Sequence, residues 1–175
     1  MLTRPSSAGF TLIEILVVLI VVGLLAALAV ISIGDGGRQR ELENEVRELY
    51  LLMQTASEQA VLNNQELGLL IEEDRYQFVV YDDENGDWER KGDRLFSARQ
   101  LPEWMTVTEF IENDLPRLSS NEDRLRPDVV FFSSGEFTPF ELEFTIGSVS
   151  DRRHLIWSDG LSPLEWIAPG EQRDE

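Results

Sequence analysis

The sequence has no cysteine and one histidine, and these two scarcities limit catalysis and metal binding. Without cysteine there is no disulfide, no thiol nucleophile and no Cys-ligated metal. The histidine, His154, stands beside Arg152 and Arg153 and is interpreted as a strand-edge residue. No Gly-x-Ser-x-Gly elbow, P-loop or dinucleotide-binding glycine pattern is present. The sequence therefore predicts a protein that is not an enzyme and uses no cofactor.

Basic residues are also scarce. Fifteen Lys and Arg stand against 33 Asp and Glu, which gives a formal net charge of -18. Nucleic-acid affinity comes mainly from counterion release by clustered Lys and Arg, so no nucleic-acid partner is expected. A strongly acidic surface keeps a domain soluble and repels anionic lipid. The polar part of the chain, from about residue 38 onward, is therefore expected to stand away from a membrane surface.

The acidic stretch at residues 82–87, with the sequence Asp-Asp-Glu-Asn-Gly-Asp, invites comparison with a calcium-binding loop. An EF-hand loop needs Asp at its first position, Gly at its sixth and a bidentate Glu at its twelfth. If Gly86 is the sixth residue, then Tyr81 is the first and Gly92 the twelfth, so the pattern fails. Asn85-Gly86 instead predicts a hairpin turn, and no metal site is expected.

Proline and charge are both absent from one long apolar run. From Ile15 to Ile33 no residue is charged, and the run counted from Phe10 would rise about 36 Å as a helix. The hydrocarbon core of a bilayer is about 30 Å thick, so residues 10–33 are predicted to form a transmembrane helix. Three kinds of segment carry such a run: a secretory signal peptide, here cut near residues 27–29, a plain signal anchor, and a prepilin with a short leader.

The residues ahead of the run favour the prepilin. Residues 1–9 are polar with one positive charge, Arg4, and the hexapeptide Gly-Phe-Thr-Leu-Ile-Glu follows at residues 9–14. This hexapeptide resembles the start of type IV pilins and type II secretion pseudopilins. The resemblance implies that a prepilin peptidase cuts between Gly9 and Phe10 and that the new N-terminal Phe10 is N-methylated. Residues 1–9 are then a leader that is removed.

Glu14 is the charged residue at the start of the apolar run. A charge inside a membrane helix costs about 3 kcal/mol on insertion scales. Cleavage creates an amino group at Phe10, which shares a helix face with Glu14 four residues later. The carboxylate can pair with its own amine or with that of a neighbouring subunit, or it can reach the cytoplasmic interface by snorkelling. The resemblance implies the intersubunit pair, which sets the axial step of a fibre.

The charge distribution and the resemblance also predict orientation. Arg4 keeps the leader on the cytoplasmic side under the positive-inside rule. The protein is then a single-pass protein of a bacterial inner membrane, with its C-terminal domain in the periplasm.

Residues 34–66 are predicted to be a join followed by an amphipathic helix. Gly34, Gly36 and Gly37 are expected to weaken or break the helix, at about 1 kcal/mol each relative to Ala. Beyond them a helix is predicted from Arg38 to about Asn63, with an apolar stripe that packs on its own domain. The stripe consists of Leu42, Val46, Leu49, Met53, Ala56 and Ala60.

Residues 67–175 are predicted to form a β-rich domain with a frayed acidic tail after Pro169, since the apolar period changes to two. The strands are expected at residues 67–71, 76–81, 95–98, 105–111, 129–133, 137–146, 154–157 and 164–167. A turn at Ser134-Gly135-Glu136 is expected to join two of them as a hairpin, with Gly135 at positive φ. The polar segment 112–127 is interpreted as a surface loop and a candidate partner surface.

The stretch at residues 129–146, VVFFSSGEFTPFELEFTI, carries a second resemblance. It is similar to the C-terminal hairpin of the GspH/FimT group of pseudopilins through its Ser-Gly-Glu turn and its Thr-Pro-Phe-Glu-Leu sequence, and the length of the match favours the GspH type. The resemblance implies a type IV pilin-like α+β fold. In that fold a long N-terminal helix, half transmembrane and half amphipathic, precedes an antiparallel domain of two sheets.

The same resemblance implies a function. The protein is expected to be a minor pseudopilin of type II secretion, a structural subunit at or near the tip of the periplasmic pseudopilus that helps export folded proteins across the outer membrane. Its expected partners are the G-, I-, J- and K-type pseudopilins, the inner-membrane assembly platform and, as processing enzyme, the prepilin peptidase. The alternative is a FimT-like minor pilin of a type IV pilus, active in pilus biogenesis or DNA uptake.

Overall fold

The computed structural model describes residues 11–111, 125–147 and 149–171, and it describes no side chains for residues 26–35, 111 and 149–151. The chain divides into two compact units, residues 1–40 and residues 41–175. The expected leader, residues 1–9, and part of the expected surface loop, residues 112–124, lie outside the described residues.

The helix α1 extends from Leu12 to Asn63 and belongs to both units. Its end agrees with the prediction, because Asn64 follows at a positive φ of 49° and the Gln65 N–H donates to the Ala60 carbonyl at 3.1 Å. An asparagine in this left-handed conformation is a common helix stop. Gly34, Gly36 and Gly37, which were expected to weaken or break the helix, do not break it, since helix continues through residues 34–37. The low helix propensity of glycine did not override the favourable residues on both sides.

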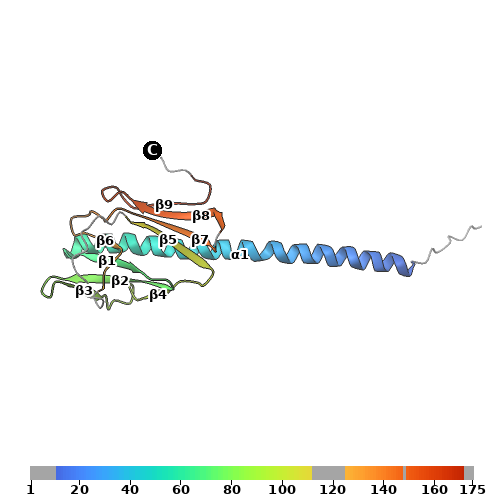
Figure 1. Cartoon of the computed structure of the whole chain (residues 1–175), viewed down its shortest axis with the longest axis horizontal. Coiled ribbons are helices and arrows are strands. Elements are labelled where there is room, and N and C mark those ends of the chain that lie inside the picture. Colours follow the sequence, from blue (N-terminus) through green and yellow to red (C-terminus); the bar gives the residue numbers. More distant parts are fainter. Residues whose placement is uncertain (1–10, 112–124, 148, 172–175) are drawn as a thin grey trace, which may run out of the picture. The chain divides into compact units, whose positions relative to one another are not determined.

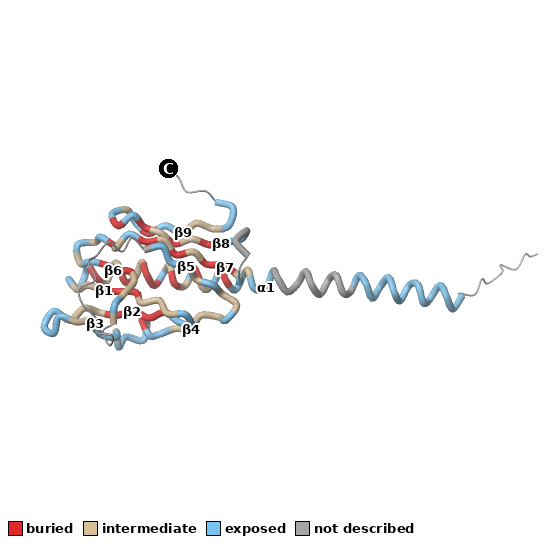
Figure 2. Tube along the Cα trace, in the orientation of Figure 1, coloured by how far each residue is buried: buried red, intermediate tan, exposed pale blue. Residues whose placement is uncertain are grey.

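The first unit contains the first part of α1. Every described side chain from Leu12 to Leu25 is exposed within this chain (Figure 2). Within the part of the chain that the structure describes, no helix has the length and apolarity needed to cross a bilayer.

The first sheet of the second unit is antiparallel and has the order β3-β2-β1-β6, with β4 also paired to β2 (Figure 1). Its strands are β1 Leu67–Ile71, β2 Arg75–Asp82, β3 Asp87–Arg90, β4 Arg99–Gln100 and β6 Val129–Phe131. The hairpin at Asn85-Gly86 is confirmed, because β2 and β3 pair across residues 83–86 and Gly86 has a φ of 66°. The strand expected at residues 95–98 was wrong: those residues form a turn and loop, and the short β4 follows them.

The second sheet is also antiparallel and has the order β5-β7-β8-β9. Its strands are β5 Met105–Ile111, β7 Phe140–Ile146, β8 Val149–Ser158 and β9 Glu165–Ile167. His154 was wrongly expected at a strand edge. It lies in β8 between β7 and β9 and is 2% exposed.

The predicted hairpin around Ser134-Gly135-Glu136 was only locally correct. Gly135 has a positive φ of 92°, and a single bridge pairs Phe131 with Phe137. However, β6 pairs with β1 in the first sheet, while β7 pairs with β5 and β8 in the second. The segment 132–139 is therefore a crossover between sheets, with Pro139 just before β7, where its missing N–H disrupts no ladder.

One apolar core joins α1 to both sheets. All six residues of the predicted stripe are 2% exposed or less, which confirms that this helix face packs on its own domain (Figure 2). The predicted alternation in β7 is also confirmed, with Phe140, Leu142 and Phe144 buried on one face. The expected α+β fold with two antiparallel sheets is thus confirmed.

Candidate assembly helix and docking groove

The first turn of α1 is capped by its own sequence. The Glu14 backbone N–H donates to the Thr11 carbonyl at 3.1 Å and to Thr11 Oγ1 at 3.4 Å. A Thr at the N-cap with a Glu three residues later is the capping-box pattern. Sequence reasoning treated Glu14 only as a membrane charge and missed this second role. A carboxylate in the first turn also interacts favourably with the helix dipole.

Gly9 and Phe10 lie outside the described residues, so the structure places Glu14 but not its expected partner. Cleavage between Gly9 and Phe10, N-methylation of Phe10 and the pairing of its amine with Glu14 stay predictions.

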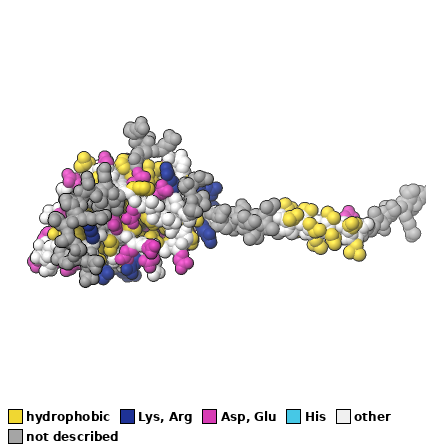
Figure 3. Space-filling view, viewed as in Figure 1, with side chains coloured by type: hydrophobic (Ala, Val, Ile, Leu, Met, Phe, Trp, Pro, Cys, Tyr) yellow, Lys and Arg dark blue, Asp and Glu magenta, His cyan; other side chains and the backbone are white. Residues whose placement is uncertain are grey.

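The surface after Glu14 is apolar on every side. Large apolar side chains from Leu12 to Leu25 are 48–89% exposed in this chain (Figure 3). Consecutive residues of an α-helix point about 100° apart, so such a run leaves no polar face. A helix that is hydrophobic all round needs an apolar environment, which lipid or packed neighbouring helices provide.

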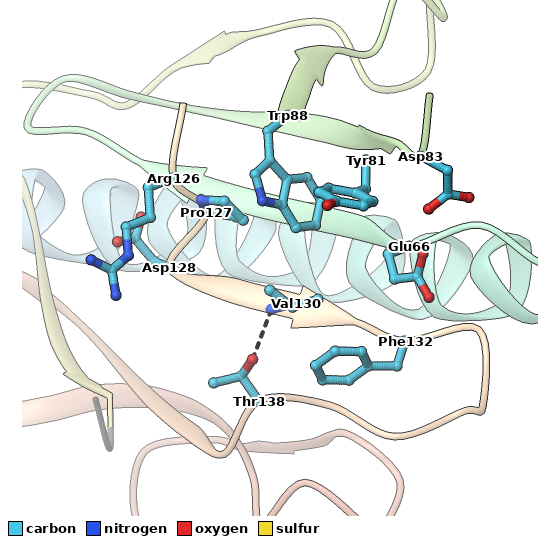
Figure 4. Close-up of a pocket in the computed structure, with 10 residues that line it drawn as sticks. All are labelled: Glu66, Tyr81, Asp83, Trp88, Arg126, Pro127, Asp128, Val130, Phe132 and Thr138. Atoms are coloured by element: carbon cyan, nitrogen blue, oxygen red, sulfur yellow. Dashed lines mark hydrogen bonds between the residues drawn. The ribbon is translucent and has the colours of Figure 1, made fainter. Parts of the chain in front are cut away.

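The second unit carries an open groove of about 460 Å³ on the first sheet (Figure 4). Sequence reasoning did not single it out. Its apolar side chains come from the β2–β3 hairpin and from the distant segment around β6, and only the pairing of strands in the sheet brings these two parts together. The lining residues are Glu66, Tyr81, Asp83, Trp88, Arg126, Pro127, Asp128, Val130, Phe132 and Thr138.

Aromatic rings dominate the middle of this groove. Tyr81 in β2 and Trp88 in β3 are directly opposite each other in the hairpin, and their ring centroids lie 5.3 Å apart in an edge-on arrangement. Phe132 lies across from this pair in Figure 4, just after β6, and is 39% exposed. The groove therefore has an apolar middle that the described part of the chain leaves open.

The two ends of the groove differ in charge. The carboxylates of Glu66 and Asp83 lie at one end, and Arg126 and Asp128 at the other (Figure 4). Ser133 Oγ donates to Glu66 Oε1 at 3.1 Å. Among the described residues, no Lys or Arg forms an ion pair with Glu66 or Asp83. The end formed by these two residues is therefore acidic, and no Lys or Arg from residues 11–111, 125–147 or 149–171 forms an ion pair there.

At the other end of the groove, Asp128 is held by hydrogen bonds to the backbone of β1. Asp128 Oδ2 accepts the Ile71 N–H at 2.7 Å, and the Asp128 N–H donates to the Leu69 carbonyl at 2.8 Å. Burial raises the pKa of Asp128, while the bond from Ile71 and the nearby Arg126 act in the opposite direction. Thr138 bridges back to β6, since its Oγ1 accepts the Val130 N–H at 3.2 Å. The groove is therefore built on fixed strands and their ends.

A separate polar cluster attaches α1 to the second sheet. Trp166 in β9 donates through Nε1 to Nδ1 of the buried His154 at 3.3 Å. The Trp166 ring lies 6.0 Å from the Tyr50 ring, and the Arg47 guanidinium lies 5.5 Å over it. Burial lowers the pKa of His154, and the nearby Glu43 carboxylate partly offsets this. His154 is thus a buried residue of the fold, and its burial favours the neutral imidazole.

Among the residues that the structure describes, no group of three or more His, Asp or Glu side chains is arranged to hold a metal ion. The acidic turn after β2 is organised differently. The Asp82 carboxylate accepts the Glu84 and Asn85 backbone N–H groups and the Asn85 side-chain amide. These bonds, led by that of the Asn85 amide, lower the pKa of Asp82.

A capped helix with apolar, exposed side chains at residues 12–25 and a C-terminal part packed on two antiparallel sheets defines a type IV pilin-like protein. The comparisons with known proteins agree. A family model described as Type II transport protein GspH matches residues 45–160, and a model of the prokaryotic N-terminal methylation motif matches residues 4–33. The chain belongs to the GspH family of type II secretion minor pseudopilins.

Relatives and solved structures support this membership. Type II secretion system protein H of Pseudomonas aeruginosa is 34% identical over 166 residues, which is 89% of this chain and 93% of the relative. The protein of the same name from Aeromonas hydrophila is 31% identical over 182 residues, 98% of this chain and 99% of the relative. These relatives favour type II secretion over the type IV pilus alternative.

Two solved structures share the fold. A structure of the minor pseudopilin EpsH from the type II secretion system of Vibrio cholerae has a TM-score of 0.64 at 20% identity, covering 77% of this chain and 99% of its own. The solution structure of Escherichia coli GspH has a TM-score of 0.52 at 17% identity, covering 75% and 93%. At these identities the likeness concerns the fold alone.

Proposed function

We propose that this chain is a membrane-anchored structural subunit of a periplasmic pseudopilus, at or near its tip, which helps export folded proteins across the outer membrane. The observation that carries the proposal is the apolar surface of residues 12–25, exposed on every side of the helix. It follows directly on Gly9 and Phe10, within the stretch that matches the methylation motif.

In this proposal residues 10–33 anchor the protein in the inner membrane, and residues 41–175 are periplasmic. The prepilin peptidase removes residues 1–9, and Phe10 is N-methylated. The chain itself catalyses nothing. Its partners are the G-, I-, J- and K-type pseudopilins and the inner-membrane assembly platform.

Glu14 supplies the register of assembly. In an apolar surrounding its carboxylate is satisfied by the Phe10 amine of a neighbouring subunit. Breaking a buried ion pair by removing one partner costs about 3–5 kcal/mol, because the other charge is left buried and unpaired. A misplaced subunit carries that cost, so the pair selects one axial position.

Mapping the mature N-terminus of the full chain by mass spectrometry tests the processing step. We expect a single N-methylated end at Phe10. An intact leader, or an end near residues 27–29, would contradict the proposal.

The assembly step is tested with Glu14→Gln, which keeps the side-chain volume and removes the charge. We expect incorporation into sheared pseudopili to fall by at least about 100-fold, as the loss of a buried pair implies. The exposed Glu41 provides a matched control, and Glu41→Gln is expected to leave incorporation unchanged. Normal incorporation of the Glu14 variant would refute the role given to Glu14.

A further inference from the structure

The groove on the first sheet has the composition of a peptide-binding site. Tyr81 and Trp88 are half-buried and Phe132 is exposed, and accessible aromatic side chains in a groove are a common feature of interaction surfaces, where Trp and Tyr supply much of the binding energy. Tyr81 and Trp88 form one wall, and Phe132 stands across from them (Figure 4). The groove has a volume of about 460 Å³.

The charges specify which kind of segment fits. Glu66 and Asp83 place two carboxylates beside the aromatic middle, and the part of the chain that the structure describes gives neither an ion-pair partner. A Lys or Arg next to an apolar residue would complement this arrangement, since opposite potentials steer and orient binding. At the other end Arg126 lies beside Asp128, so that end is close to neutral.

We infer that this groove docks an extended segment of a different pseudopilin subunit, which places a large apolar side chain between Trp88 and Phe132 and a Lys or Arg against Glu66 and Asp83. The inference rests on the proposed function and names the surface through which the second unit contacts its neighbour. It requires no movement of the strands that line the groove.

Charge argues against a second copy of this chain as the occupant. Each copy carries a formal net charge of -18, and bringing two such acidic domains together at an acidic groove is electrostatically unfavourable. A neighbouring subunit of different sequence has no such restriction. The same acidity argues against nucleic acid, which needs clustered cations.

The direct test is photo-cross-linking of the full-length protein in cells. A benzophenone amino acid replaces Phe132, which is 39% exposed in the groove, or Leu95, which is 41% exposed outside it and serves as the matched control. We expect the probe at position 132 alone to capture another pseudopilin. The captured peptide should contain a Lys or Arg within a few residues of an aromatic or large aliphatic residue.

Four outcomes would overturn the inference, and three of them concern what is captured. These are capture of a second copy of this chain, an internal cross-link to residues 112–124, and equal capture from positions 132 and 95. Lack of any cross-link at position 132 in assembled pseudopili would do the same.

Substitutions test the two halves of the recognition separately. The pair Glu66→Gln with Asp83→Asn removes charge at nearly constant volume, and Trp88→Ala removes one aromatic wall. Each is expected to lower cross-link yield from position 132 about tenfold, as for central interface contacts. Glu103→Gln removes an exposed charge elsewhere and should leave the yield unchanged.

The same samples separate this inference from the proposed function. If the groove variants are cleaved at Gly9 and enter the fibre but cross-link as the unsubstituted chain does, the groove assignment is wrong and the proposed function stands. If the unsubstituted chain is neither cleaved at Gly9 nor present in pseudopili, the proposed function itself fails.

Discussion

Gly68 in β1 lies directly against Pro127 at the edge of the docking groove. A Cβ atom added at position 68 would come within 2.5 Å of Pro127 Cβ, 2.7 Å of Pro127 Cγ and 2.9 Å of Val79 Cγ2. The absence of a side chain at position 68 thus lets the chain segment before β6 lie close to the first sheet. This contact holds Pro127 and the adjacent Asp128 in the groove wall.

Gly68→Ala is expected to destabilise the second unit. The contacts of a new Cβ involve ring carbons of a proline, which cannot rotate away, so backbone must shift. Overpacking of this kind costs about 1–3 kcal/mol, measurable as a lower midpoint in chemical denaturation. Gly92→Ala is the matched control, because a Cβ there meets nothing within 4 Å and the substitution should be neutral. Equal effects of both substitutions would show that close packing at Gly68 is unimportant.

Leu49 and Leu51 provide a test of the helix stripe within one turn of α1. Leu49 is 2% exposed and packs in the core, whereas Leu51 is 53% exposed. Leu49→Ala removes buried methyl groups and leaves a cavity, so its unfolding free energy should fall by about 2–5 kcal/mol. Leu51→Ala should change it by less than about 0.5 kcal/mol, as for ordinary surface substitutions. A large effect at Leu51 would mean that this face of α1 is also buried in the isolated protein.

His154 makes stability depend on pH. Its pKa is lowered in the fold because of burial, so between that value and the unfolded value of about 6.5 the unfolded chain binds more protons. The contribution of His154 is therefore present above pH 6.5 and is lost as pH falls through the folded pKa. The limiting slope is about 1.4 kcal/mol per pH unit for one proton. Denaturation curves between pH 5.5 and 7.5 should show this decline.

The control for this prediction replaces His154 with a side chain that cannot bind a proton. His154→Phe is expected to reduce the pH dependence in this interval, even though the loss of the Trp166 hydrogen bond lowers stability at every pH. An unchanged slope in this variant would assign the effect to other groups.

Features set by neighbouring residues were predicted well from the sequence. The spacing of Leu42, Val46 and Leu49 identified the buried helix face, and period-two patterns identified β1 and β5 with the bounds that the structure has. The turn at Gly135 was also predicted, because a positive φ there is a local requirement.

Features that depend on distant pairing were not predicted. Nothing near Phe131 and Phe140 in the sequence indicates that they join different sheets, since β6 pairs with the distant β1, while β7 pairs with β5 and β8. The groove depends on that crossover, which brings Thr138 back to Val130. The burial of His154 was also not predicted, because it involves tertiary contacts such as that with the Trp166 ring. The continuation of α1 through Gly34, Gly36 and Gly37 was not predicted for another reason. Helix propensity is a weak preference, and the rest of a long helix overrides it.

The long buried stripe on α1 has a mechanical consequence. From Leu42 to Ala60 its side chains extend over about 27 Å of helix axis, at ~1.5 Å per residue, and all are inserted in the same core. Tension transmitted along the helix loads these contacts in shear, all at once, and none of them can be peeled off alone. A force applied along this part of the helix would therefore move the whole folded domain together with it.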